Sequence, residues 1–194
     1  MKNKINTKDY LKKINSAFTA EVNRNIEKLA KTLNHAWKNN KNIFICGNGG
    51  SAANAMHIAN DLIYGAGVKK NKGLKVEALS SNSSVLTCLA NDIGYENIFL
   101  EQLRVKANKG DILIVLSGSG NSQNVINALN FAKKNKVKSF SILGYSGGEC
   151  KKISDYSIHF KVNDMQISED LQLITGHLCM QWLLLAQVLL PLIH

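Results

Sequence analysis

The apolar run ILIVL at residues 112–116 is the feature that most constrains the fold. It is continuous and rich in β-branched residues, which is the pattern of a strand buried on both faces of a parallel sheet. A second such run, 43–46, ends like the first in a loop of small residues. Further strands are expected at 74–79, 138–143 and 156–161, and helices at 51–64, 84–90, 95–107 and 123–134. The alternation predicts an α/β domain whose five-stranded parallel sheet is covered by helices on both faces.

Long helices with many large apolar side chains are expected at both ends of the chain. In residues 8–39, large apolar side chains recur at steps of three and four, and residues 167–190 are apolar nearly all round. One small sheet cannot cover both helices, so packing against other copies of the chain is the favoured interpretation. We expect a single domain with an N-terminal oligomerisation helix (1–40), a sheet core (41–165) and a C-terminal helix (166–192).

Composition excludes several classes of protein. Hydrophobic residues make up 45% of the 194 residues, and there are 14 glycines and one proline, which argues against disorder and collagen-like structure. The net charge of +10 is concentrated near the start of the chain, but no nucleic-acid-binding motif accompanies it. A solvated helix face is therefore favoured over a nucleic-acid partner, and a positive field suits a small anionic substrate.

Location in the cell is predicted from three features. The first residues lack the apolar segment of a secretory signal, and the apolar run near the C-terminus is short for a membrane span. Four widely spaced cysteines, without a CxxC pair, indicate reduced thiols. We therefore expect a cytoplasmic protein with no membrane partner.

Two loops of small residues follow the strands at 43–46 and 112–116. The first, GNGGSA from Gly47, opens a helix, where glycines and free N–H groups let an anion approach the backbone. Its spacing also fits the loose dinucleotide fingerprint, but the nearest candidate acid, Glu77, lies too far along the chain. The second loop, SGSGNS from Ser117, offers hydroxyl and N–H groups without charge and suits a phosphate monoester. Both loops are expected at the sheet edge where α/β proteins bind ligands.

Four segments, taken in order, resemble one known family. They are CGNGGSAANAMH (46–57), LANDIGYENIF (89–99), LSGSGNSQNVINAL (116–129) and a late helix containing GH (176–177). Together they resemble the SIS (sugar isomerase) domain family and, within it, the phosphoheptose isomerases. The resemblance covers nearly the whole chain and implies a flavodoxin-like three-layer αβα fold, a homotetramer and an aldose–ketose isomerase. The implied reaction converts sedoheptulose 7-phosphate to D-glycero-D-manno-heptose 7-phosphate, the first step towards heptose for bacterial lipopolysaccharide or another surface glycan.

The resemblance also implies which residues contact the sugar phosphate. They are Asn48, Gly49, Gly50, Ser51, Asp61, Asn91, Asp92, Ser117, Gly118, Ser119, Ser122 and Glu169. Gly118 stands where the family commonly has threonine, so one hydroxyl is lost while the backbone donor remains.

A zinc site is implied in the same way. His57 and His177 match metal ligands, Asp61 stands where the family has glutamate, and Glu169 where it has glutamine. His57 and Asp61 lie one helical turn apart and share a face. Two imidazoles and two carboxylates suit zinc. Asp61 is further expected as the catalytic base, and His177 as its acid/base partner.

Other interpretations stay open from the sequence. Some SIS proteins bind partners instead of catalysing, including one that assists the bacterial replication initiator, and the altered ligands and basic first helix leave room for this role. An isomerase or sensor of another phosphosugar is a further alternative. His57 has a simpler explanation as a core histidine, and Glu169 as an acid near a helix start capped by Ser168.

Overall fold

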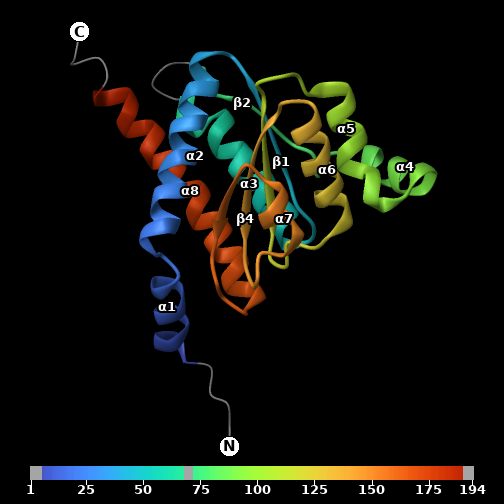
Figure 1. Ribbon diagram of the computed structural model, residues 1–194. Coiled ribbons are helices and arrows are strands. Elements are labelled where there is room, and N and C mark those ends of the chain that lie inside the picture. The colour runs from blue at the N-terminus through green and yellow to red at the C-terminus, as the bar shows by residue number, and fades with distance from the viewer. Residues whose placement is uncertain (1–5, 68–71, 190–194) are drawn as a thin grey trace, which may run out of the picture.

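A computed structural model describes residues 6–67 and 72–189 of the chain (Figure 1). Five parallel strands form one sheet in the order β2-β1-β3-β4-β5. The strands are β1 (Asn42–Cys46), β2 (Lys75–Ala78), β3 (Ile112–Ser117), β4 (Lys138–Leu143) and β5 (Tyr156–His159). This order is that of flavodoxin-like folds, in which the chain reverses direction across the sheet between β1 and β3.

Helices cover both faces of the sheet (Figure 1). They are α1 (Thr7–Ser16), α2 (Ala20–Lys38), α3 (Gly50–Ile63), α4 (Ser83–Ile93), α5 (Ile98–Lys106), α6 (Gln123–Lys134), α7 (Gly148–Ile153) and α8 (Met165–Leu189), with short 3₁₀ turns η1 (Gly65–Gly67) and η2 (Tyr95–Asn97). Successive residues of β3 enter different cores. Ile112 and Ile114 pack with α2, α3 and α8, whereas Leu113 and Val115 pack with α5 and α6. The predicted three-layer α/β fold is therefore confirmed.

Every predicted strand is present, with bounds that differ by two residues at most. The strand expected at 156–161 ends at His159, and the one expected at 74–79 spans Lys75–Ala78. Helix α7 was not predicted, because its six residues, GECKKI, show no apolar periodicity.

The expectation of one continuous helix over residues 8–39 is wrong. Helix α1 ends at Ser16 and α2 begins at Ala20, where the Oγ1 of Thr19 accepts a hydrogen bond from the N–H of Val22 at 3.2 Å. Capping side chains of this kind compete with helical hydrogen bonds and start a new helix. Phe18 lies in the break between the two helices and packs edge-on against Phe160. The apolar periodicity of the sequence therefore continues through the break.

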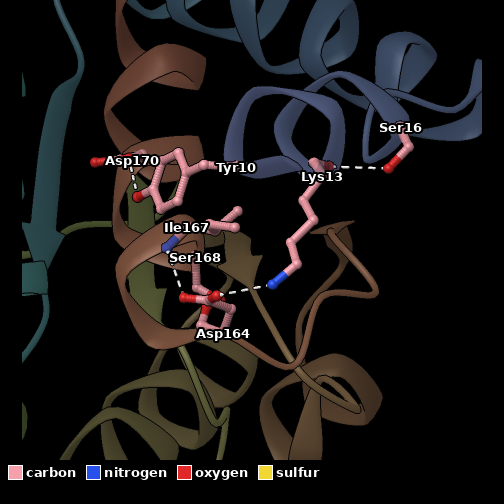
Figure 2. A network of polar contacts seen from close by, with 7 residues as sticks. All are labelled: Tyr10, Lys13, Ser16, Asp164, Ile167, Ser168 and Asp170. Atoms are coloured by element: carbon pink, nitrogen blue, oxygen red, sulfur yellow. Dashed lines mark hydrogen bonds and ion pairs between the residues drawn. The ribbon is translucent and has the colours of Figure 1, made fainter. Parts of the chain in front are cut away.

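Helix α1 projects from the domain and is attached to the start of α8 by polar contacts (Figures 1 and 2). The Tyr10 hydroxyl donates to Asp170 at 2.6 Å, and Lys13 pairs with Asp164 at 3.5 Å. The hydrogen bond to Asp170 raises the pKa of Tyr10 to about 12. No residue of α1 is buried, so its apolar residues add little to the core of a single chain.

Helix α8 packs against α2 and α3 through residues such as Leu171, Cys179 and Leu183. Its opposite side is open, since Leu178 and Leu185 are 39% and 61% exposed. Within residues 6–67 and 72–189, no helix combines the length and the apolar character needed to cross a membrane.

Candidate active site

The two small-residue loops meet at the carboxyl ends of neighbouring strands. The first follows β1, the second follows β3, and together with α8 they enclose a hollow of about 270 Å³. Nine residues expected to contact substrate line it: Asn48, Gly49, Gly50, Ser51, Ser117, Gly118, Ser119, Ser122 and Glu169. Two glycines allow this close approach. Gly49 has a φ of 54°, and a Cβ at Gly47 would lie 2.8 Å from the carbonyl oxygen of Leu116.

Hydrogen-bond donors converge on this hollow. Helix α6 begins beside it, and its N-cap residue, Ser122, makes no capping bond with its side chain, so its hydroxyl remains available. The Oγ of Ser117 accepts the N–H of Gly120 at 3.0 Å, which fixes the loop. Free N–H groups and the positive end of a helix dipole favour an anion here.

The dinucleotide alternative finds no support at Glu77. Glu77 lies on β2, and its carboxylate pairs at 2.5 Å with Lys106 of α5. Glu77 does not line the hollow.

Sequence reasoning missed a buried amide pair beneath the first loop. Asn48 and Asn124 each donate to the other's side-chain oxygen, at 2.9 and 2.8 Å. Asn124 is 2% exposed, and its Oδ1 also accepts a hydrogen bond from the N–H of Val125. The Tyr95 hydroxyl donates to the Oδ1 of Asn48 at 2.9 Å. The pair ties the loop after β1 to the first turn of α6. The only signal in the sequence is that Asn124 lies within the second small-residue motif.

A cluster of three titratable side chains lies further along α3. The Nε2 atoms of His57 and His177 are 3.1 Å apart, and the Oδ2 of Asp61 lies 3.4 Å from each of them. His57 and Asp61 come from successive turns of α3, and His177 comes from α8, which packs against it. All three are partly exposed, so small molecules have access to them.

The donor atoms of this cluster fit a zinc ion. Zinc bonds of about 2.0–2.1 Å in tetrahedral geometry place neighbouring ligand atoms about 3.3 Å apart. The observed separations of 3.1, 3.4 and 3.4 Å match that value. Among the described residues these three form the group that can hold a metal, and Glu169 is not part of it. Instead, a side chain at Gly50 would collide with the Glu169 carboxylate, which places Glu169 at the first loop.

Asn91 and Asp92 lie apart from both the hollow and the cluster. They sit near the end of α4, a helix with no buried residue that projects from the domain (Figure 1). Their side chains make local contacts: Asn91 donates to Asp92 at 2.8 Å, and the Cys88 thiol donates to the same carboxylate at 3.5 Å. A single chain therefore does not bring this expected pair to the site.

Known proteins are similar to this chain in sequence. Residues 8–144 match the SIS domain. A phosphoheptose isomerase from a Nitratiruptor species is 41% identical over 143 residues, which are 74% of this chain and 76% of that protein. Another, from Helicobacter pylori, is 37% identical over 171 residues, or 88% and 86% of the two chains. The chain belongs to the SIS domain family, among the phosphoheptose isomerases.

Solved structures of this family have the same fold. The phosphoheptose isomerase from Neisseria gonorrhoeae superposes with a TM-score of 0.83 at 25% identity, covering 91% of this chain and 94% of its own. The structure from Francisella tularensis gives a TM-score of 0.86 at 22% identity over 91% and 93%.

In this SIS domain, Gly118 lies directly against the side chain of Met165. A Cβ at Gly118 would lie 2.5 Å from the Sδ of Met165, at the start of α8. The partly exposed Met165 side chain would have to shift to make room for a threonine at this position. Gly118 and Met165 are complementary in shape, and the wall of the hollow is apolar at this point.

Proposed function

We propose that the protein converts sedoheptulose 7-phosphate to D-glycero-D-manno-heptose 7-phosphate in the cytoplasm, supplying heptose for a bacterial surface glycan such as lipopolysaccharide. One observation carries the proposal: helix α3 bears a phosphate-suited loop at its start and the His–Asp–His cluster two turns later. The family of the chain fixes the reaction class as aldose–ketose isomerisation.

The spacing along α3 suits a seven-carbon chain. At about 1.5 Å per residue, His57 lies about 10 Å along the axis from Gly50. An extended heptulose 7-phosphate places its phosphorus about 9 Å from C2, given bonds of about 1.5 Å. With the phosphate in the loop hollow, C1 and C2 reach the cluster.

The loops bind the unreactive end of the substrate. The N–H groups at the start of α6, with the hydroxyls of Ser119 and Ser122, hold the phosphate by neutral donors. This binding positions the distant C1 and C2 for reaction, so that remote contacts assist the chemistry.

Proton transfer belongs to Asp61 and His177. Isomerisation removes a proton from C1, forms an enediolate and returns a proton to C2, which needs a base near both carbons. In the described part of the chain, Asp61 contacts the two imidazoles through Oδ2, which leaves Oδ1 to take the proton. His177 would exchange protons with the substrate oxygens through Nδ1, because its Nε2 faces that carboxylate at 3.4 Å and is the nitrogen that would hold zinc. Zinc held by His57, Asp61 and His177 would polarise the carbonyl and hydroxyl oxygens.

Self-association, as a tetramer, is part of the proposal. Large apolar side chains are exposed on the two helices that carry the cluster: Met56, Ile63 and Tyr64 on or next to α3, and Leu178 and Leu185 on α8. Tyr64 is 74% exposed. Further copies of the chain packed here would remove this apolar surface from water.

A substrate panel tests the proposal. Zinc-supplied protein is incubated with sedoheptulose 7-phosphate, fructose 6-phosphate or ribulose 5-phosphate, and the aldose products are separated. We expect turnover of the heptulose at a kcat/KM at least about tenfold above the others, since the shorter ketoses lack one or two CHOH units and even a missing methylene lowers kcat/KM by about this factor. Faster turnover of a shorter ketose would assign another substrate, and absence of turnover with all three would favour a binding protein.

A further inference from the structure

A second hollow lies at the opposite end of the strands from the site. It has a volume of about 520 Å³, within the range of small-molecule sites, and is formed where the strands begin. Lys41 precedes β1, Lys138 starts β4, and Lys133 and Lys136 lie at and after the end of α6. None of the proposed catalytic or substrate-contacting residues lines it.

The charge of this hollow is strongly unbalanced. Across the described part of the chain, none of its four lysines forms an ion pair, and Lys41 donates only to the carbonyl oxygen of Lys109, at 3.3 Å. Asp155 is the acid that lines the hollow, and its Oδ2 accepts two bonds from Ser139. The ends of α2 and α6 add about −0.5 each, so four lysines and one aspartate leave a net charge of about +2.

Lys41 and Lys138 reach the hollow from the starts of separate strands. Strands β1 and β4 lie on either side of β3, and Ile43, Ile112 and Lys138 are in register across the three strands. At about 4.8 Å per strand, the starts of β1 and β4 are about 10 Å apart. Lys41 and Lys138 thus approach the hollow from different strands, and an anion with two adjoining phosphate groups can contact both of them while it balances more of the positive charge. The Tyr156 ring already contacts Lys28, whose Nζ lies 3.7 Å from the ring centre, and Phe140, so it is a poor stacking platform for a base.

We propose that this lysine hollow binds a small polyanion with two or more adjoining phosphates, such as free diphosphate or the diphosphate group of a nucleotide. Charge-assisted hydrogen bonds from Lys41, Lys133, Lys136 and Lys138 hold the phosphates. The site is separate from the catalytic loops, at the other end of the strands.

Calorimetric titration tests the proposal. The protein used carries Ser119→Ala and Ser122→Ala, two substitutions that weaken phosphate binding at the catalytic loop. The probes are sodium diphosphate, ADP and sodium phosphate. We expect diphosphate to bind at least about tenfold more tightly than monophosphate, because charged hydrogen bonds are added. Equal affinity for diphosphate and ADP assigns recognition to the diphosphate group, and tighter binding of ADP assigns a nucleotide.

A matched pair of triple variants locates the binding. Adding Lys133→Gln, Lys136→Gln and Lys138→Gln should weaken diphosphate binding at least about tenfold. The control, Lys8→Gln, Lys12→Gln and Lys151→Gln, removes the same charge from exposed positions outside the hollow and should leave affinity within about twofold, because exposed charges are screened. Circular dichroism establishes that both variants are folded. Equal weakening by both variants, no preference over monophosphate, or tighter binding of a single-stranded DNA oligonucleotide than of diphosphate would overturn the proposal.

Discussion

The imidazoles of His57 and His177 face each other, Nε2 to Nε2 at 3.1 Å, although 120 residues separate them in the chain. Their rings are edge-on, with centroids 5.2 Å apart, and the Oδ2 of Asp61 completes a nearly equilateral triangle of donor atoms. Two facing imidazole nitrogens need a shared proton or a cation between them. This relationship is the basis for the proposed zinc site.

Removal of one imidazole should release the metal. We expect wild-type protein to retain one zinc ion per chain after dialysis, and His57→Ala to retain little, because Asp61 and His177 leave the tetrahedral set incomplete. Elemental analysis of the dialysed proteins measures this. The control is His35→Ala, which removes an exposed histidine from α2. Zinc retained at full occupancy in His57→Ala would refute the assignment.

The buried amide pair should support both substrate binding and stability. Asn124→Ala leaves the side-chain N–H of Asn48 and the Val125 N–H without their shared acceptor, while the Asn48 oxygen keeps the hydrogen bond from Tyr95. We expect a higher KM and a free energy of unfolding lower by about 1–3 kcal/mol, the usual effect of orphaning a buried polar group. Urea denaturation and steady-state kinetics measure the two effects. Asn130→Ala, at an exposed position of the same helix, should change neither.

Two serines of the second loop should behave differently. Ser122→Ala removes a hydroxyl that makes no capping bond, so KM should rise while stability is unchanged. Ser117→Ala removes the acceptor of the Gly120 N–H, so the free energy of unfolding should also fall, by about 1 kcal/mol. Measuring KM and urea midpoints for both variants checks this. Equal stability of the two variants would show that the Ser117–Gly120 bond does not hold the loop.

Acid should destabilise the protein through His159. Desolvation lowers the pKa of this histidine, despite the hydrogen bond from its Nε2 to the Tyr145 carbonyl. The unfolded chain therefore binds a proton first as the pH falls below about 6.5, and stability falls with it. We expect the loss of melting temperature between pH 7.5 and 5.5 to be smaller for His159→Gln, which keeps an N–H donor without titrating. His35→Gln, at an exposed histidine, should lose as much as wild type.

Sequence patterns predicted those parts of the fold that depend on continuous apolar runs. The run at 112–116 and its neighbours gave the sheet because strands buried on both faces leave that signature. The break at Thr19 was missed because the apolar stripe continues through it, and only the side-chain cap marks the new helix.

Local spacing decides only part of the site's geometry. His57 and Asp61 share a face of α3 as their spacing requires. The Asn48–Asn124 pair joins residues far apart in the sequence, and neither was marked as the partner of the other. Glu169 lies two helical turns before His177, so its placement depends on how α8 docks on the loops, which the pattern of one helix does not encode.

A time course of sedoheptulose 7-phosphate with zinc-supplied protein, followed by proton NMR, tests the central claim most directly. The account predicts that the anomeric signal of D-glycero-D-manno-heptose 7-phosphate grows with time. It also predicts a rate at least about 100-fold lower for Asp61→Asn, which removes the base. No aldose signal from folded, zinc-loaded wild type, or equal rates for the two proteins, would contradict it.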